Sequence, residues 1–400
     1  MNETFVTEYL KNRQAAVGSA DEALRQKLHE LKKSSVARLP ELVEKAKKSL
    51  EANGVKVYLA KDNAEAGAIL NRLLEGTHLA VKSKSNLITE LRQDGSWVPA
   101  RQAEALAGGP ACEIVETDIG DFLAEICQER TDHPVLPALN LTREKTLFAL
   151  SKKYPQEEKA LMAMSSEQLV RFLSSKIREK ILAAEVGLTG ANAITAEGQI
   201  MLVENEGNIS LISRIPLKHV VVAGIEKVAE TAEDALHVAH CAAVWGTGQP
   251  WTSYVNFISG PAKTADLGNE LVLGAQGAKE VHLILVDDWR SSFVGEGFEE
   301  MLYCINCGAC ENTCPVFLTE GTAVKILDPE KNYLCATCGA CTLNCPAGID
   351  WRSLTTLARQ KHAAANLAPP AAKTMLEKVQ KFGNPFGEKV EGTPKELYCC

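Results

Sequence analysis

Two copies of one cysteine pattern constrain this chain more than any other feature of its sequence. The first phrase, CINCGACENTCP, runs from Cys304 to Pro315, and the second phrase, CATCGACTLNCP, runs from Cys335 to Pro346. Together they contain eight of the thirteen cysteines. Each phrase has three cysteines separated by two residues, then a fourth after three more, followed by proline. In the bacterial two-cluster arrangement, this spacing wraps three thiolates around one iron–sulfur cubane and sends the fourth to the other cubane.

The pattern therefore predicts two [4Fe-4S] clusters with exchanged fourth ligands. The predicted ligands are Cys304, Cys307, Cys310 and Cys345 for the first cluster, and Cys335, Cys338, Cys341 and Cys314 for the second. Gly308 and Gly339 allow the backbone to fold close to inorganic sulfide. Two structural zinc sites are the alternative, but zinc usually takes separated C-x2-C pairs, and the repeated run fits that poorly.

Clusters with four cysteine ligands leave no iron open to a substrate, so their predicted chemistry is one-electron transfer. Such a relay needs a donor and an acceptor. No G-x-G-x-x-G motif follows a predicted strand, and WGTGQPW (245–251) does not fit one. The sequence therefore predicts an electron relay without identifying its two ends.

The residues before the phrases alternate between short apolar strands and helices. The expected strands are VKVYLA (55–60), HLAVKS (78–83), EIVET (113–117), QIMLVE (199–204), HVVVAG (219–224) and VHLILVD (281–287). Continuous β-branched runs separated by helices predict an α/β fold with a mostly parallel sheet covered on both faces.

These patterns predict that the chain is divided into four segments. We expect a helical segment over 1–53, an α/β domain over 54–293, and a small α-helical, bacterial-ferredoxin-like 2[4Fe-4S] domain over 294–362. A linker and C-terminal tail occupy 363–400.

The bulk composition narrows the class of protein further. The chain has 400 residues and a net charge of -8, which argues against a broad nucleic-acid footprint. No apolar run approaches the roughly 20 residues of a membrane span. The N-terminus, MNETFVTEYLKNRQ, lacks a signal-peptide core. Clustered cysteines in a reducing compartment are usually metal ligands, so we expect a cytoplasmic iron–sulfur protein.

Several stretches of the α/β region resemble the lactate-utilisation (LUD) domain. They are VKSKSNLITE (81–90), VETDIGDFLAEI (115–126), GLTGANAITAEGQIMLVENEGN (187–208), HVVVAGIEKV (219–228) and ISGPAKTADL (258–267). With a two-cluster module after it, the domain order resembles that of the B-type iron–sulfur proteins in this family. The resemblance implies a sheet like that of sugar-phosphate isomerases and coenzyme A transferases.

The resemblance also implies a function and partners. Members of the family are tied to oxidation of L-lactate to pyruvate, in a complex with a cysteine-rich CCG-domain subunit and a second LUD subunit or flavoprotein. The stretches KFGNPFG (381–387) and PKELYCC (394–400) look like the entry into such a CCG domain. We expect a separate polypeptide to supply that domain, or the chain to be truncated after Cys399 and Cys400.

This chain departs from the family pattern at two places in the α/β region. It has DDWR (287–290) where the family usually has DNGR, and Asn140 where the family usually has a histidine. A role for that histidine therefore does not carry over.

A ligand pocket is expected where polar residues follow the predicted strands. Its candidate residues are Lys82, Lys84, Gly190, Asn192, Glu204 and Asn208, with Glu206 as a candidate catalytic base or carboxylate-binding group. The lysines could instead lie in a solvated loop, and ENEGN (204–208) could be a turn that satisfies its own backbone. GLTGAN (187–192) is expected to be a loop. Thr117 and Asp118 are expected to cap a helix.

Three functional hypotheses remain open. The first is an electron-transfer subunit of a complex that oxidises lactate or a related 2-hydroxy acid. The second is an enzyme in its own right, whose α/β pocket binds substrate and whose clusters are the electron outlet. The absence of a recognised two-electron cofactor site counts against the second. The third is a scaffold whose clusters only stabilise the fold.

Overall fold

The computed structural model describes residues 3–18, 20, 22–93, 95–97, 112–390 and 393–394. The chain divides into two compact units. Unit 1 comprises Met1–Ala309 and Pro346–Ile349, and unit 2 comprises Cys310–Cys345 and Asp350–Cys400. Cys399 and Cys400, for which the sequence left two interpretations, lie outside the described residues.

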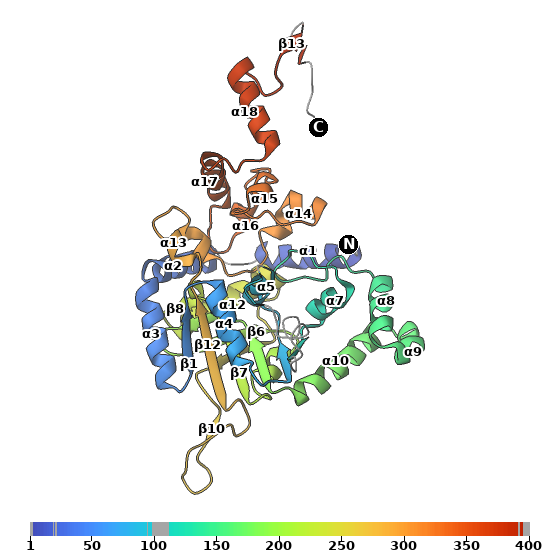
Figure 1. Cartoon of the computed structure of the whole chain (residues 1–400), viewed down its shortest axis with the longest axis vertical. Coiled ribbons are helices and arrows are strands. Elements are labelled where there is room, and N and C mark those ends of the chain that lie inside the picture. Colours follow the sequence, from blue (N-terminus) through green and yellow to red (C-terminus); the bar gives the residue numbers. More distant parts are fainter. Residues whose placement is uncertain are drawn as a thin grey trace. The chain divides into compact units, whose positions relative to one another are not determined.

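Unit 1 contains most of the regular structure (Figure 1). Its α-helices are α1 (Glu3–Gly18), α2 (Glu22–Ala37), α3 (Leu39–Ala52), α4 (Asn63–Leu73), α5 (Asn86–Gln93), α7 (Ile119–Cys127), α8 (Arg143–Lys153), α9 (Glu158–Ala163), α10 (Ser166–Ala183), α11 (Asn208–Ile212), α12 (Ala232–Ala242) and α13 (Arg290–Phe293). Its strands are β1 (Lys56–Ala60), β2 (Leu79–Lys82), β3 (Glu113–Glu116), β4 (Val186–Thr189), β5 (Ala193–Thr195), β6 (Ile200–Glu204), β7 (Lys218–Gly224), β8 (Val228–Ala229), β9 (Tyr254–Ile258), β10 (Lys263–Thr264), β11 (Val272–Leu273) and β12 (Glu280–Val286). Short 3₁₀ or π segments are η1 (Pro155–Glu157), η2 (Ile225–Lys227), η3 (Ala243–Thr247) and η4 (Glu299–Tyr303).

Within the described residues of unit 1, six strands form a sheet in the order β1-β12-β7-β4-β2-β3, and all neighbouring pairs are parallel. The predicted α/β fold with a mostly parallel sheet is confirmed. Alternate side chains of β7 and β12 enter opposite cores, as the period-2 geometry of a strand requires. Val220, Val222 and Ile284 pack on one face, whereas Val221 and Leu283 pack on the other.

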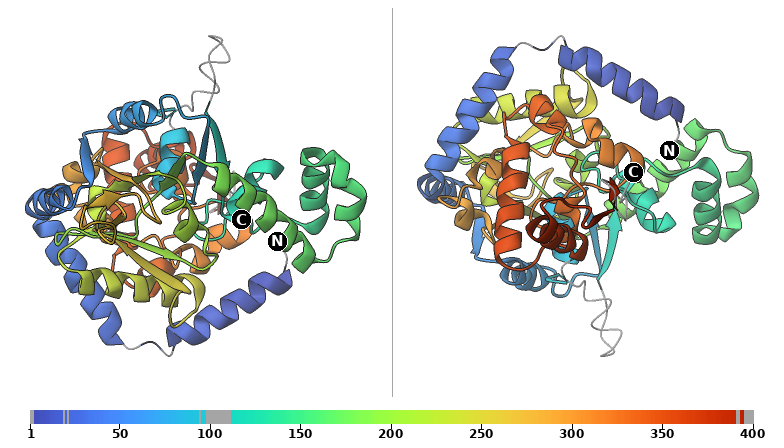
Figure 2. Two further views of the ribbon diagram at one scale, coloured as in Figure 1. Left: turned by 90° about the horizontal axis from the view of Figure 1, so that it is seen from below. Right: turned by 90° about the horizontal axis from the view of Figure 1, so that it is seen from above.

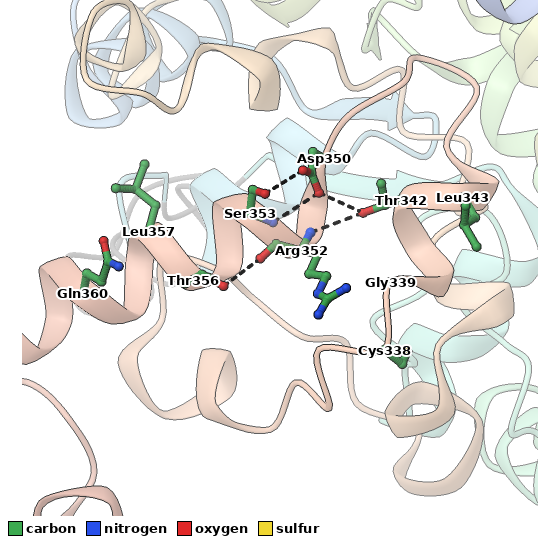
Figure 3. A pocket seen from close by; sticks show the side chains of 10 residues that line it. All are labelled: Cys338, Gly339, Thr342, Leu343, Asp350, Arg352, Ser353, Thr356, Leu357 and Gln360. Atoms are coloured by element: carbon green, nitrogen blue, oxygen red, sulfur yellow. Dashed lines mark hydrogen bonds between the residues drawn. The ribbon is translucent and has the colours of Figure 1, made fainter. Parts of the chain in front are cut away.

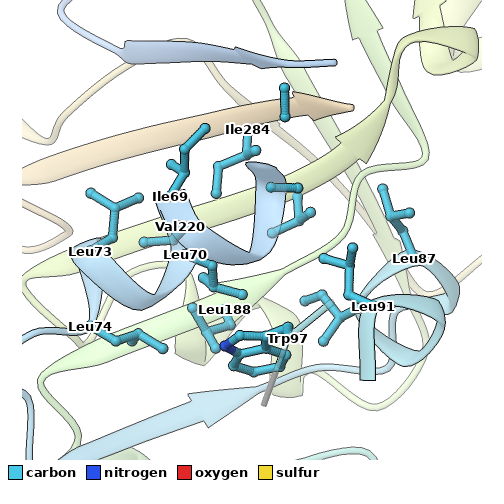
Figure 4. Packing of buried hydrophobic residues seen from close by; sticks show 14 of the residues in the cluster. Ile69, Leu70, Leu73, Leu74, Leu87, Leu91, Trp97, Leu188, Val220 and Ile284 are labelled. Atoms are coloured by element: carbon cyan, nitrogen blue, oxygen red, sulfur yellow. The ribbon is translucent and has the colours of Figure 1, made fainter. Parts of the chain in front are cut away.

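Helices α4 and α5 cover one face of this sheet. Their apolar residues Leu70, Leu73 and Leu91 surround the buried Trp97 and meet Leu188 of β4 (Figure 4). Trp97 satisfies its indole N–H by donating to Oδ1 of Asn71 at 2.9 Å. A buried tryptophan thus fills the core without leaving its polar atom unpaired.

The opposite face is covered by α3 and by a second sheet. Among the described residues, four strands form this sheet in the order β8-β5-β6-β9, in which β6 is antiparallel to both neighbours. Leu42 and Leu50 of α3 pack with Ile194 and Ile200 of the second sheet. QIMLVE (199–204), one of the strands expected to form the parallel sheet, therefore belongs to a different layer.

Helices α7 to α10 form a further core beside the outer strand pair β2 and β3. Leu147, Leu161 and Leu173 pack there with Val81 of β2. Figure 2 shows residues 143–183, in green, gathered at one side of the unit. This group lies beside the segment that follows β3, where candidate polar residues are found.

Strand β4 corrects the prediction that GLTGAN (187–192) is a loop, because Val186–Thr189 is a buried strand. Its glycine is required by close packing. A Cβ atom on Gly187 would lie 1.9 Å from the carbonyl oxygen of Ile212, so α11 can rest on β4 only if residue 187 has no side chain.

Unit 2 is built from short helices, as predicted for a small cluster-binding domain. Its helices are η5 (Glu311–Thr313), α14 (Pro315–Glu320), α15 (Pro329–Tyr333), α16 (Ala340–Asn344), α17 (Trp351–Ala364) and α18 (Pro370–Phe382), and its strands are β13 (Lys389–Val390) and β14 (Thr393–Pro394). No helix in the described part of the chain is long and apolar enough to cross a membrane.

Candidate functional site

A buried ion pair lies at the carboxyl edge of the parallel sheet in unit 1. Strands β2 and β3 are paired so that Lys82 is opposite Glu116, each the last residue of its strand. Lys82 Nζ contacts Glu116 Oε2, and both side chains are buried. Glu116 Oε1 also accepts the backbone N–H groups of Thr117 and Asp118, at 2.8 and 2.9 Å. The pair therefore fixes the turn that leaves β3.

The next turn adds two aspartates and two cations. Asp118 caps α7 by accepting the N–H of Asp121 at 2.9 Å, which confirms its predicted capping role. The buried carboxylate of Asp121 forms an ion pair with Arg130 and lies 3.8 Å from Nζ of Lys84. Lys84 also donates to the carbonyl oxygen of Val135. The carboxylates and cations thus form one network.

The loop between β6 and α11 approaches this network from the second sheet. Glu206 Oε2 accepts the N–H of Ile119, the first residue of α7, at 3.2 Å. Asn208 Nδ2 donates to Oγ1 of Thr117 at 3.1 Å. Of the predicted pocket residues, the structure thus brings Lys82, Lys84, Glu206 and Asn208 together.

We call the polar cluster the set Lys82, Lys84, Glu116, Asp118, Asp121, Arg130 and Glu206. Its crowding shifts the protonation of its members. Burial raises the pKa of Glu116 to about 7, although Lys82 opposes this shift. Glu206 is exposed as a residue, yet partial desolvation of its carboxyl group and the nearby Asp118 raise its pKa to about 7 as well. Burial lowers the pKa of Lys84. The cluster therefore has carboxyl groups that exchange protons near neutral pH.

The remaining predicted pocket residues hold the local backbone in place. Asn192 Oδ1 accepts the N–H of Val203 at 2.9 Å. Glu204 Oε1 accepts the N–H of Ser210 at 2.8 Å and is also bonded by Asn256 Nδ2 at 3.0 Å. A Cβ on Gly190 would lie 2.9 Å from Ser85 Oγ. In the described structure these three residues therefore have internal packing or bonding partners, and their ligand-binding role stays a prediction.

Asp121 and Arg130 were missed by the sequence analysis. Asp121 is three residues after the helix cap Asp118, a position where an acidic residue is ordinarily explained by the helix dipole. Arg130 follows α7 in a stretch without periodic pattern, so no local signal indicates its contact with Asp121.

The two cysteine phrases adopt the same local backbone. Asn306 and Thr337, each two residues after the first cysteine, have positive φ angles of 57° and 53°. Gly308 and Gly339 have φ angles of 74° and 78°. The N–H of Asn306 donates to Sγ of Cys304 at 3.4 Å, and that of Thr337 donates to Sγ of Cys335 at 3.3 Å. Each phrase thus forms a loop with an N–H directed at its first sulfur.

The thiols of the second phrase influence the protonation of Cys341. Burial raises the pKa of the Cys341 thiol to about 11, and three neighbouring thiols act in the same direction. These neighbours are Cys335, Cys314 and Cys338. Cysteine thiolates are the donors that a [4Fe-4S] cluster takes, and binding of such a cluster would displace their protons. In the described residues, however, no three Cys, His, Asp or Glu side chains are placed closely enough to hold a metal ion, so the ligand set stays a prediction.

Helix α17 supports the second phrase. Arg359 Nη2 donates to the carbonyl oxygens of Asn332 and Cys335, at 2.9 and 2.8 Å. The guanidinium also lies over the ring of Tyr333, 5.1 Å from its centroid. One arginine therefore fixes the backbone at the start of the cysteine loop.

Family models match both parts of the chain. The model described as LUD domain matches residues 43–286, and the model described as 4Fe-4S dicluster domain matches residues 303–349.

Three curated relatives illustrate the similarity. "Lactate utilization protein B" of Bacillus pumilus is 33% identical over 72% of this chain and 57% of its own length. The protein of the same name from Shouchella clausii is 32% identical over 67% of this chain and 53% of its own length. "Uncharacterized electron transport protein YkgF" of Escherichia coli is 30% identical over 66% of this chain and 52% of its own length. The chain thus spans about half the length of the curated relatives it matches.

A solved structure shows a weaker likeness. A DUF162 family protein from Deinococcus radiodurans is 11% identical, with coverage of 62% of this chain and 98% of that protein. The TM-score of 0.32 is too low to support an argument about the fold.

Breaking the ion pair of β2 and β3 should cost more than breaking an exposed one. Lys82→Met leaves the Glu116 carboxylate buried without its cation, so the free energy of unfolding should fall by about 3 kcal/mol. Adding Glu116→Gln, which still accepts the two backbone N–H groups, should recover part of this loss. Urea denaturation followed by circular dichroism measures both. Lys56→Met, which breaks the exposed pair with Glu280, is the matched control and should cost less than about 1 kcal/mol. Equal losses for Lys82→Met and Lys56→Met would contradict this prediction.

Glu206→Gln should reduce the dependence of stability on pH. Because the pKa of Glu206 is raised to about 7 in the folded state, its contribution is complete below about pH 4.5 and is lost as the pH rises through 7. Between pH 5 and 8, the wild type should lose about 1 kcal/mol more stability than the variant, a value reduced for partial solvent exposure. Thermal unfolding across this range is the measurement, with Glu179→Gln on the exposed side of α10 as the control. Parallel pH profiles for wild type and Glu206→Gln would contradict a raised pKa of Glu206 in the folded state.

The two loop glycines should differ in their tolerance of alanine. Both have positive φ, which costs an alanine about 1 kcal/mol. A Cβ on Gly308 would also lie 2.7 Å from Cε1 of His133, whereas the nearest atom to a Cβ on Gly339 is 3.8 Å away. Gly308→Ala should therefore lower the melting temperature and the iron content of anaerobically purified protein more than Gly339→Ala does. Equal losses for the two variants, or the opposite order, would contradict this prediction.

Proposed function

Because the chain belongs to the LUD domain family and includes a 4Fe-4S dicluster domain, we propose that it is the iron–sulfur electron-transfer subunit of an oxidoreductase complex. The complex oxidises L-lactate, or a related 2-hydroxy acid, to pyruvate. The proposal of lactate as the substrate rests on the name "Lactate utilization protein B", which several relatives share. The electron-transfer role rests on the repeated thiolate loops.

The observation that supports this function most directly is the thiol group of the second phrase. Cys341 interacts with three other thiols, and the N–H of Thr337 is directed at the sulfur of Cys335. A bound cubane supplies one-electron transfer at such a site. The chain's own residues hold the ligands in place, since Arg359 fixes the backbone carbonyl of Cys335. We assign the first cluster to Cys304, Cys307, Cys310 and Cys345 because the first phrase adopts the same loop.

The polar cluster supports a second candidate function, a substrate-binding enzyme in its own right. Lys84 and Arg130 could attract a carboxylate, and Glu206, with a pKa near 7, could accept a proton. Lys82 is less suited to bind a substrate because it is buried against Glu116. Oxidation of a hydroxy acid removes two electrons, so a partner with a two-electron cofactor remains part of the proposal. We propose a cysteine-rich CCG-domain subunit together with a second LUD subunit or a flavoprotein.

The test uses tagged chain purified without oxygen together with its native partners. We expect about eight iron atoms and eight labile sulfides per chain, as two [4Fe-4S] clusters require. Addition of L-lactate should bleach the cluster absorbance. Bleaching that needs the partners supports the electron-transfer subunit, whereas bleaching of the flavin-free chain alone supports the second candidate. Clusters that dithionite reduces but lactate does not would remove lactate as the donor. Protein without iron would overturn the electron-transfer role.

A further inference from the structure

Unit 2 has an open hollow beside the second phrase, with a volume of about 630 Å³. Cys338 and Gly339 form one side, and Arg352, Thr356 and Gln360 of α17 form another (Figure 3). These three side chains recur every four residues, so they share one face of the helix. Cys338 is the exposed cysteine among those that the structure describes. The hollow therefore lies where a predicted cluster ligand reaches the surface.

The hollow is lined by one acidic and one basic side chain, Asp350 and Arg352, and they differ in their partners. Asp350 accepts from Ser353 N, Ser353 Oγ and Thr342 Oγ1, at 3.2, 2.6 and 3.3 Å. Its carboxylate is thus engaged in capping α17. Arg352 donates its backbone N–H to Thr342 Oγ1, but its guanidinium has no hydrogen bond or ion pair with any other described residue. Figure 3 shows this side chain on the side of α17 that faces Gly339 and Cys338.

Arg359 is seven residues after Arg352 and therefore lies on the same side of α17, where it adds a second positive charge. The helix itself contains no acidic residue. Leu343 of α16 also lines the hollow, and 76% of its surface is exposed. Arginine is enriched in protein interfaces, and the exposed leucine adds apolar area to the same hollow.

We propose that this hollow is the docking surface on which the second cluster exchanges single electrons with a small acidic electron-carrier protein. This inference rests on the proposed function, because it requires Cys335, Cys338, Cys341 and Cys314 to hold a cluster. Carboxylates on the carrier form ion pairs with Arg352, and apolar residues around these carboxylates contact Leu343. The step moves one electron: the cluster is oxidised by one and the carrier is reduced by one, without making or breaking a bond. An acidic carrier is favoured because opposite charges steer the encounter and orient the two surfaces.

The experiment uses the full chain with its clusters and a plant-type [2Fe-2S] ferredoxin as the acidic probe. Affinity is measured by calorimetry with both proteins oxidised, so that no electron moves. The rate of electron exchange is then measured by anaerobic stopped flow at low and high salt. Arg352→Glu should lower both affinity and second-order rate at least tenfold at low salt, whereas Arg352→Lys should stay within threefold of the wild type. The losses of affinity and of rate caused by Arg352→Glu should both be smaller at high salt, because salt screens the charges.

Lys361→Glu is the matched control. Lys361 is nine residues after Arg352, which at 3.6 residues per turn places it on the opposite side of α17. It should change affinity and rate less than twofold. Iron content, melting temperature and cluster midpoint potentials are measured for every variant, and we expect them to match the wild type.

Three results would overturn the docking surface while leaving the clusters in place. The first is absence of saturable binding to the ferredoxin. The second is an equal loss of affinity and rate for Arg352→Glu and Lys361→Glu, which would show that the net charge of the chain, and not the position of Arg352, determines binding. The third is a changed midpoint potential with unchanged affinity, which would make Arg352 a group that tunes the cluster. Protein without iron would instead mark failure of the proposed function itself.

Discussion

The parallel pairing of β2 with β3 is the constraint on which the polar edge of unit 1 depends. It sets Lys82 opposite Glu116, so that the two charges enter the protein interior together. A buried charge without its partner would cost several kcal/mol, which makes the alignment of the two strands strongly specified. Because Glu116 also accepts two backbone N–H groups, the same pairing positions the start of α7. The carboxylates of Asp118 and Asp121 are therefore placed by sheet geometry.

The sequence predicted where several strands of the parallel sheet lie better than it predicted which strands pair with one another. Runs such as HVVVAG and VHLILVD became central strands because both of their faces are buried. Strand β4 was missed, since its glycine at position 187 is explained by a contact with Ile212, twenty-five residues later in the chain. QIMLVE is equally apolar, yet β6 joins the second sheet. Periodicity identifies a strand, but strand order depends on contacts that no local pattern encodes.

The same distinction applies to the candidate sites. Lys82 and Lys84 were predicted because of their place at the end of an expected strand, and the cysteine ligands were predicted from the spacing of the repeated phrase. Arg130 and Arg359 were not predicted, because each acts on a residue that is distant along the chain or lies in another element. The exposure of Cys338 was not predictable either, since ligand spacing describes the loop and not what covers it.

The two cysteine loops differ in one residue whose backbone is left-handed, and the two residue types adopt that conformation with different ease. Both require a left-handed residue two positions after their first cysteine, filled by Asn306 in one and Thr337 in the other. Asparagine visits this region readily, whereas a β-branched threonine is strained in it. The two loops therefore have the same backbone at unequal cost, and more conformational strain is stored in the second loop than in the first.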